Sequence, residues 1–150
     1  MKFKGFTKKQ LLEIYQNMAM SRYLDDKQLI LLKQGKGFFH IGGAGHEAAG
    51  LAAAVNFKHE LDFAYPYYRD QAFCLGWGMD SRDHLLAFLA KQDDPSSGGR
   101  QMPQHFGHHK LNIVSQSSPT GTQLLQAVGA GFAIQRNGEQ AVVYVSMGDG

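Results

Sequence analysis

The chain has 150 residues, of which 43% are hydrophobic and 19% are charged, and its formal net charge is +2. That length suits about one domain with a buried core, and so small a charge gives no reason to expect nucleic acid or a membrane surface as a partner. The longest nonpolar run, residues 48–55, is too short to cross a bilayer, and the N-terminal lysines lack the apolar stretch of a secretory signal, so we expect a cytoplasmic protein.

The first part of the chain is predicted to be a helical arm over residues 1–35. Residues 7–10, "TKKQ", have the pattern of a capping box, and Gly35 is a typical helix stop. Arg22 interrupts the apolar face, where it is either a surface charge or half of a structural ion pair. The apolar positions that keep a helical spacing are Leu11, Tyr15, Met18, Leu24, Leu31 and Leu32.

Four segments follow in the middle of the chain. Small residues over 46–56 predict a short helix that packs tightly against a neighbour. Residues 62–70 are aromatic and extended, and they end in a loop or a helix start. Ser81 is expected to cap a helix over 82–92. A long polar loop over 93–110 comes next, and loops of that length in compact domains are usually functional or disordered.

The end of the chain has the pattern of a strand–helix alternation. Residues 112–119 are predicted to form a strand fragment and a turn, 120–135 a helix, and 141–145 a buried strand. Gly129 and Gly131 each cost the helix about 1 kcal/mol relative to Ala, so we expect a close helix-to-sheet contact that offsets this cost. The alternation predicts an α/β sheet that has only begun, and whose last strand lacks partners.

The last three residues are Gly148, Asp149 and Gly150, shortly after the predicted strand. In open α/β sheets, ligands bind outside the carboxyl ends of the strands. Glycine there lets backbone N–H groups approach a phosphate, and a neighbouring aspartate can hold Mg²⁺. The same residue types also make ordinary turns, which is the better interpretation of this motif in isolation.

The stretch "YPYYRD" places the phenols of Tyr67 and Tyr68 beside the guanidinium of Arg69. A guanidinium suits phosphate because its planar fork matches the phosphate oxygens. The alternative is an aromatic core edge, in which Arg69 is paired with Asp62 or Asp70. The spacing alone does not separate these two interpretations.

Three histidines, His105, His108 and His109, lie in the polar loop. Zinc usually takes three or four protein ligands, and no cysteine lies nearby, so a metal site is disfavoured. We prefer one functional imidazole on a mobile loop, because histidine titrates near neutral pH. The other histidines are expected to be structural or on the surface: His40, His46, His59 and His84. Of these, only His40 and His46 could border a site.

The stretch "SQSSPTGTQ" carries hydroxyl groups on both sides of a proline, just before a predicted helix. Its simple interpretation is a helix start, with Ser118 as the N-cap and Pro119 at the first helical position. That local structure does not exclude oxygen ligands for a monovalent cation, or hydrogen bonds to a cofactor.

Taken together, these stretches resemble one family, the alpha subunit of the first component of 2-oxo acid dehydrogenase complexes, which uses thiamine diphosphate. The resemblance runs from about residue 18 to residue 150. Its motifs are "RYLDDKQLILLKQGK", "GHEAAGLAAA", "YPYYRD", "GGRQMPQHFG", "SSPTGTQLLQAVGAGFA" and "GDG". The "GRQMPQH" and "SSPTGTQ" stretches look more like the branched-chain, 2-oxoisovalerate type than the pyruvate type. The "SQSSPTGTQ" stretch is also similar to the corresponding stretch of chains that fuse the alpha and beta parts into one polypeptide.

The resemblance implies a fold and a site. The fold would be an incomplete α/β thiamine-diphosphate-binding domain over residues 1–150, with a helical N-terminal region leading into a parallel sheet flanked by helices. The cofactor would contact Tyr68, Arg69, Ser118, Thr120, Gly148, Asp149 and Gly150. The substrate would face Phe39, Tyr68, Met102 and the catalytic His105. Mg²⁺ would be bound by Asp149, and K⁺ would be surrounded by Ser117, Pro119, Thr122 and Gln123.

The implied activity is oxidative decarboxylation of a 2-oxo acid, followed by reductive acylation of a lipoyl group on the acyltransferase second component. A beta subunit, or a fused beta part, would complete a heterotetramer of two alpha and two beta chains and supply the glutamate that activates the cofactor. The family's Asn pair, which completes the Mg²⁺ site beyond "GDG", is absent here. We therefore expect a chain cut within its cofactor motif, inactive alone and with little affinity for thiamine diphosphate.

Three alternatives stay open. The chain could belong to a pyruvate- or acetoin-type first component. It could be a non-catalytic assembly module that uses the same surfaces without a cofactor. A generic phosphate-binding α/β domain is the weakest of the three, because it leaves "YPYYRD" and "GRQMPQH" unexplained.

Overall fold

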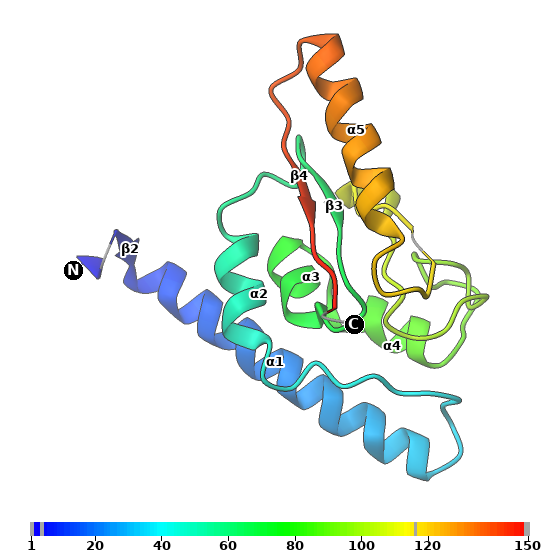
Figure 1. Ribbon diagram of the computed structural model, residues 1–150. Helices are drawn as coiled ribbons and strands as arrows, with labels where there is room; N and C mark the ends of the chain where they lie inside the picture. Colours follow the sequence, from blue (N-terminus) through cyan, green and yellow to red (C-terminus); the bar gives the residue numbers. More distant parts are fainter. Residues whose placement is uncertain (1, 4, 116, 149–150) are drawn as a thin grey trace.

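The fold is a small parallel sheet between layers of helix, seen in a computed structural model (Figure 1). The long helix α1, Lys8–Lys33, packs against α2, Glu47–Ala54, and α3, Gln71–Trp77. These two short helices cover one face of the sheet, and α5, Gln123–Asn137, covers the other. The expected α/β layering is therefore confirmed. The structure describes residues 2–3, 5–115 and 117–148.

Helix α1 begins and ends as predicted, but its buried face matches the prediction only in part. The capping box forms, since Gln10 N donates to Thr7 Oγ1 at 3.3 Å and Thr7 N donates to Gln10 Oε1 at 2.9 Å. The expected apolar face is only partly buried, because Leu24 is 4% exposed but Leu11 and Tyr15 are 36% and 68% exposed. The buried residues of α1 are Ser21, Leu24, Asp25 and Gln28. Three of these four are polar, so they need hydrogen-bonding partners on the neighbouring elements.

The small residues of α2 allow it to pack closely on α3, as predicted. A Cβ atom on Gly50 would lie 2.8 Å from the backbone nitrogen of Phe73, so no larger residue fits there without movement. Arg22 of α1 is half of an ion pair with Glu47, at 2.6 Å from Nη2 to Oε1. Burial alone would raise the pKa of Glu47, but backbone hydrogen bonds and Arg22 together bring it below its ordinary value.

The sheet joins segments that are far apart in the chain. Strand β3, Phe63–Tyr65, pairs in parallel with β4, Val143–Val145, so that Ala64 lies opposite Tyr144. Ile113 forms an isolated parallel bridge with Ala64 as well. The expectation that the last strand lacks partners is therefore wrong. All three segments run in the same direction, so their carboxyl ends meet at one edge.

Two segments between the strands differ in detail from the prediction. Helix α4, Ser81–Phe88, is shorter than expected, and its cap is Asp80 rather than the serine, because Asp80 Oδ1 accepts from Asp83 N at 2.9 Å. The polar loop that follows is ordered by Asp94, which accepts three backbone N–H groups. The loop also contains a short 3-10 helix, η1, His109–Leu111.

Helix α5 starts later than predicted and does not use its glycines as expected. It begins at Gln123, and Thr122 at the N-cap makes no side-chain capping bond. The predicted start at residues 118–119 is therefore wrong. A Cβ atom on Gly129 or Gly131 would meet nothing within 4 Å. The expected close helix-to-sheet contact at these two glycines is thus absent among the described residues.

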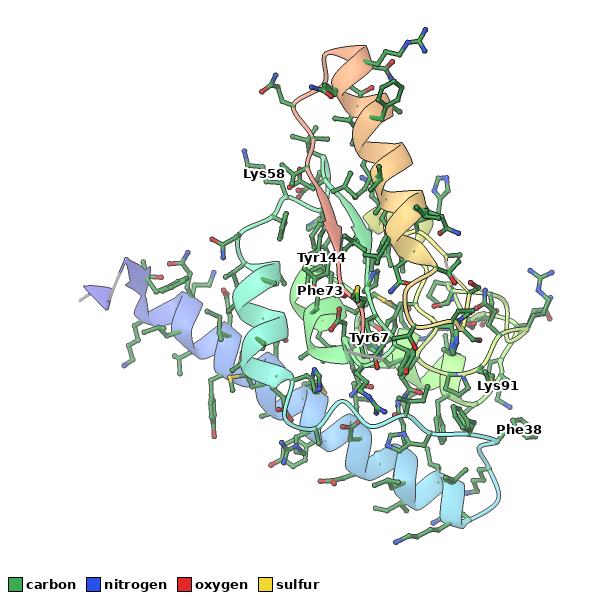
Figure 2. All side chains as sticks on the ribbon, in the orientation of Figure 1. Phe38, Lys58, Tyr67, Phe73, Lys91 and Tyr144 are labelled. Atoms are coloured by element: carbon green, nitrogen blue, oxygen red, sulfur yellow. The ribbon has the colours of Figure 1, made fainter. Side chains whose placement is uncertain are left out.

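The core lies where α3 meets the sheet (Figure 2). The ring of Phe73 stacks on Tyr144 with 4.0 Å between centroids. Trp77 Nε1 donates to the carbonyl of Leu111 at 2.7 Å, which ties η1 to the core. A short hairpin of β1, Lys2–Phe3, and β2, Phe6–Thr7, precedes α1. No helix in the described residues is long and apolar enough to cross a membrane.

Candidate active site

The candidate site lies at the edge where the parallel segments end. Residues 66–69 follow β3, residues 146–148 follow β4, and the serine-rich stretch follows Ile113. Tyr67 N donates to Ser146 Oγ at 2.9 Å, which joins the first two segments. Gln123 Nε2 donates to the carbonyl of Ser146 at 2.7 Å, which joins the third. Parallel sheets commonly bind ligands at this edge.

Asp70 fastens these segments to α3. The hydroxyl of Ser146 donates to Asp70 Oδ2, as do the hydroxyl of Tyr144 and the backbone N–H of Tyr67, each of these two at 3.2 Å. Burial raises the pKa of Asp70, although these three donors act in the opposite direction. Sequence reasoning considered Asp70 only as a partner of an arginine. No local pattern indicates its real partners, because Tyr144 and Ser146 lie far along the chain.

The backbone at Gly148 is enclosed by two side chains. A Cβ atom on Gly148 would lie 2.5 Å from Thr120 Cγ2 and 2.9 Å from the Tyr67 hydroxyl. A residue larger than glycine would require Thr120 or Tyr67 to move, so this turn is closely packed by side chains of the same chain. The structure thus brings together Gly148 and Thr120, both predicted cofactor contacts. Asp149 and Gly150 lie outside the described residues, and their roles stay predictions.

Within residues 2–3, 5–115 and 117–148, no carboxylate pairs with Arg69. Its Nη1 donates to the carbonyl of Gly42 at 3.1 Å, and its guanidinium carbon lies 5.5 Å from the centroid of the Tyr68 ring. The alternative ion pairs are wrong, because Asp70 binds the groups described above and Asp62 accepts two backbone N–H groups. A guanidinium has five N–H donors. The contact with Gly42 therefore leaves Arg69 able to bind an anion.

A pocket of about 270 Å³ opens beside Arg69. Its lining residues are Phe39, Ile41, Tyr68, Arg69, Met102, His105 and Ser118. All four residues predicted to face the substrate line this pocket. Phe39 and Met102 are 42% and 47% exposed, and they give the pocket an apolar mouth. Ile41 is the lining residue that sequence reasoning did not select, since nothing in its local pattern distinguishes it from a core residue.

His105 presents one ring nitrogen without a partner. The side chain is buried, and its Nδ1 lies 3.0 Å from the carbonyl of Pro103. A carbonyl only accepts hydrogen bonds, so Nδ1 carries the proton in this contact. Nε2 is buried and has no hydrogen-bonding partner among the described residues. The ring stacks against Tyr68 with 6.3 Å between centroids, which holds it in the pocket wall.

The other histidines do not form a metal site. Within the described residues, no group of three or more His, Cys, Asp or Glu side chains could hold a metal ion. Burial lowers the pKa of His40, with Asp25 opposing, and lowers that of His84 to about 4, with Asp80 opposing. Both therefore favour the neutral form. His46 and His109 are exposed, and His59 is half-buried.

The predicted potassium-binding residues are only partly gathered. Ser117, Pro119 and Gln123 line a small interior space together with Tyr67 and His105. Thr122 is exposed at the start of α5. The amide of Gln123 donates to the carbonyls of Ser146 and Thr120, and a donating amide still has its oxygen for a cation. The oxygen-rich loop is compatible with a monovalent cation, which stays a prediction.

The fold and the site define a known class of protein. A model of the dehydrogenase E1 component family matches residues 15–150, and the chain belongs to that family. It is 39% identical over 146 residues to the 2-oxoisovalerate dehydrogenase subunit alpha of Bacillus subtilis, covering 97% of this chain and 44% of the relative. The resemblance drawn from the motifs is therefore confirmed at the level of the family.

Relatives of two substrate types share this stretch. The mitochondrial 2-oxoisovalerate dehydrogenase subunit alpha of Dictyostelium discoideum is 30% identical over 146 residues, or 97% of this chain and 33% of the relative. The pyruvate dehydrogenase E1 component subunit alpha of Staphylococcus aureus is 32% identical over 144 residues, or 96% of this chain and 36% of the relative. The chain thus spans less than half the length of these relatives.

Proposed function

We propose that this chain carries part of the active site of a thiamine-diphosphate-dependent 2-oxo acid dehydrogenase of the branched-chain type. The observation that supports it is the convergence of Arg69, Tyr68 and His105 in one pocket, next to the enclosed backbone of Gly148. A cationic side chain suits the anionic groups of cofactor and substrate. The apolar mouth suits a hydrocarbon side chain.

The cofactor's diphosphate is assigned to Arg69 and to the glycine turn. Arg69 donates charge-assisted hydrogen bonds to phosphate oxygens. Gly148 would let the backbone approach the same group, and the hydroxyls of Ser118 and Thr120 would face the aminopyrimidine. Bound thiamine diphosphate supplies the decarboxylation chemistry, and the protein orients the reactants and excludes water.

The substrate is assigned to the mouth and the wall of the pocket. Phe39 and Met102 contact the apolar part of the 2-oxo acid. In the neutral ring of His105, Nδ1 donates to Pro103, so Nε2 can accept a proton; the resulting imidazolium can donate that proton to the substrate carboxylate, or to the sulfur that is released when the lipoyl ring opens during acyl transfer. His105 therefore serves reductive acylation more than cofactor binding.

Further partners belong to the same proposal. Asp149 binds Mg²⁺, and the loop with Ser117, Pro119, Thr122 and Gln123 binds K⁺. A beta subunit or fused beta part completes a heterotetramer, and a lipoyl domain of the second component receives the acyl group. The single domain over 1–150 is inactive without these partners. A cytoplasmic location stays a prediction, and the Dictyostelium relative is named as mitochondrial.

A pyruvate-type first component is the second candidate. The Staphylococcus relative supports it at 32% identity, against 39% for the 2-oxoisovalerate type of Bacillus. An acetoin-type enzyme stays an alternative. A non-catalytic assembly module would have the same surfaces but would not turn over a 2-oxo acid.

The test uses the full-length alpha chain assembled with its beta partner. Thiamine-diphosphate-dependent release of CO₂ is measured with 2-oxoisovalerate and with pyruvate, and acylation of a lipoyl domain is followed in parallel. The branched substrate should have the higher kcat/KM. A reversed preference favours the second candidate, and cofactor binding without turnover of any 2-oxo acid favours the assembly module.

Two variants separate the role of His105 from general damage. His105→Ala should suppress lipoyl acylation more than thiamine diphosphate binding, and His59→Ala, on the surface, should change neither. Unchanged acyl transfer in His105→Ala contradicts its assignment. Isothermal titration of the 150-residue chain with thiamine diphosphate and Mg²⁺ should show little binding, and micromolar affinity there contradicts the expected dependence on partners.

A further inference from the structure

Three buried glutamines connect the helical layer to the pocket. Gln28 comes from α1, Gln71 from α3 and Gln104 from the loop that carries His105, and each is at most 4% exposed. Gln104 Nε2 donates to Gln28 Oε1 at 2.8 Å, and Gln28 Nε2 donates to Gln71 Oε1 at 3.4 Å. The three side-chain amides therefore form one continuous chain of hydrogen bonds.

Backbone groups fix the direction of this amide chain at both ends. At the pocket end, Ile41 N donates to Gln104 Oε1 at 3.4 Å. At the other end, Gln71 Nε2 donates to the carbonyl of Ser21 at 3.0 Å. A backbone N–H can only donate and a carbonyl can only accept, so the orientation of all three amides is determined. Each amide uses its oxygen and its nitrogen, and a carboxylate or an apolar group cannot replace it.

Gln104 connects two walls of the pocket. Its side chain holds the backbone of Ile41, which lines one wall. Its own backbone has φ +61°, a conformation that non-glycine residues rarely adopt, and it lies between Pro103 and His105. Pro103 in turn accepts from His105. The stretch beside Ile41 is anchored a second time, because Gly43 N donates to Asp25 Oδ2 at 2.9 Å.

We propose that Gln104 and Gln28 are positioning residues. They set the distance between Ile41 and the loop that carries His105, and they set the orientation of His105 in the pocket. This inference rests on the proposed function. The physical reason is that a buried, continuous chain of hydrogen-bonded amides holds its members in place. Loss of one member leaves a buried partner unsatisfied and releases the loop. A shift of about 1 Å at a reacting group can lower a rate on the order of 100-fold.

The experiment uses the assembled enzyme and two variants. Gln104→Ala removes the link, and Gln28→Glu keeps its size but places a carboxylate oxygen against the amide oxygen of Gln71. Both should lower kcat/KM for the 2-oxo acid by about 10- to 100-fold. The affinity for thiamine diphosphate should change by less than about twofold, which is a small free-energy change. The reason is that neither residue is hydrogen-bonded to Arg69 or Gly148 among the described residues. Hydrogen exchange at the Ile41 amide should accelerate in both.

Further variants separate positioning from folding. Gln104→Gly relaxes the backbone but lacks the amide, so it should lose activity as Gln104→Ala does. The double variant Gln28→Ala with Gln104→Ala should lose no more than the larger single loss, because both break the same chain. The controls are Gln16→Ala, exposed on the same helix, and Gln101→Ala, exposed in the same loop, and both should behave as the wild type.

Each outcome decides the proposal. Wild-type kinetics and wild-type Ile41 exchange in the two single variants overturn it. Parallel losses of cofactor affinity and melting temperature also overturn it, because they indicate a role in folding alone. If the unmodified enzyme turns over no 2-oxo acid, the proposed function fails. Faster Ile41 exchange and altered His105 imidazole signals in the variants would then still support positioning.

Discussion

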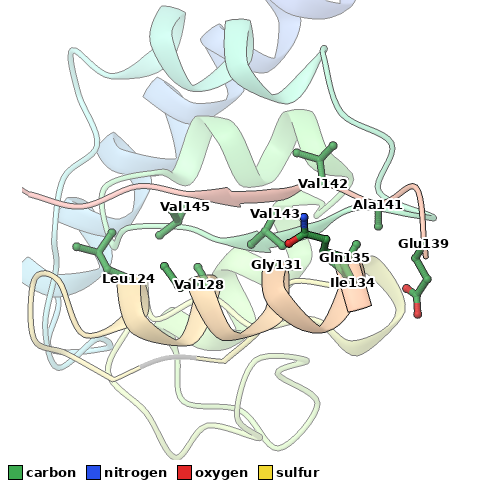
Figure 3. Close-up of a pocket in the computed structure, with 11 residues that line it drawn as sticks. Leu124, Val128, Gly131, Ile134, Gln135, Glu139, Ala141, Val142, Val143 and Val145 are labelled. Atoms are coloured by element: carbon green, nitrogen blue, oxygen red, sulfur yellow. The ribbon is translucent and has the colours of Figure 1, made fainter. Parts of the chain in front are cut away.

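The edge of the sheet is held together by hydrogen bonds within the chain, whereas the outer face of α5 exposes apolar side chains. At the edge, the hydroxyl of Ser146 donates to Asp70, and the amide of Gln123 donates to the carbonyl of Ser146, so three segments are joined. On α5, Leu125, Val128 and Phe132 are 83%, 71% and 64% exposed. A trough of about 560 Å³ between α5 and β4 is lined mainly by apolar side chains, including those of Val128 and Val143 (Figure 3).

The difference favours the smaller pocket, rather than the larger trough, as the candidate site. The trough offers hydrocarbon and little that could orient a charged ligand, whereas the smaller pocket combines a guanidinium, an imidazole and aromatic rings. Exposed apolar side chains in a group mark a surface that associates with something. The edge is therefore organised by this chain's own residues, and the outer face of α5 depends on what is packed against it.

The largest expected effect tests which side of the sheet holds the fold together. Phe73→Ala should lower the free energy of unfolding by about 3–5 kcal/mol, because it removes a fully buried ring from between α2 and Tyr144. Phe132→Ser, at an exposed ring, should change it by less than about 0.5 kcal/mol. Urea denaturation followed by Trp77 fluorescence measures both. Equal effects would break the comparison.

The second expected effect is a pH dependence that arises behind the site. Burial against Phe106 lowers the pKa of His84 from 6.5 to about 4 in the folded chain. Between those values the unfolded chain binds the extra proton, so stability is complete above pH 6.5 and is lost as the pH falls toward 4. The total is on the order of 3 kcal/mol. His84→Leu should flatten this slope in denaturation curves, and an unchanged slope contradicts the assignment.

The third expected effect concerns the enclosed backbone at the edge. Gly148→Ala in the assembled enzyme should weaken thiamine diphosphate binding by about 10- to 100-fold, because the new Cβ must displace Thr120 or Tyr67. Calorimetric titration measures the affinity, and circular dichroism checks that the fold is kept. Binding equal to that of the wild type would show that the cofactor does not approach this turn.

The smallest expected effect sharpens the comparison from the other side. Gly129→Ala should raise the free energy of unfolding of the isolated chain by about 0.5–1 kcal/mol, because alanine favours helix and nothing lies within 4 Å of the new methyl group. Thermal denaturation measures it. Stabilisation in the isolated chain with destabilisation in the assembled protein would locate a neighbour on this face of α5.

Local patterns predicted the pocket better than they predicted its supports. Phe39, Tyr68, Met102 and His105 were selected from motifs, and the structure brings all four to one cavity. The support residues Asp70 and Gln104 were missed in these roles. Their partners are distant in the chain, and a buried glutamine on α1 has no distinguishing spacing. The buried face of α1 was predicted only in part for the same reason, because its buried polar residues depend on α3.

By itself, the sequence determined the helix start at Thr7, the short helix of small residues, and the ordered set of motifs that identifies the family, because capping, propensity and motif order are properties of neighbouring residues. Only the tertiary structure decided which strands pair, that Arg69 donates to the carbonyl of Gly42 rather than to Asp62 or Asp70, and that Gly148 is enclosed by Thr120 and Tyr67. Those features need segments from distant parts of the chain to meet. The stability of these features comes from contacts between residues that are distant in the sequence.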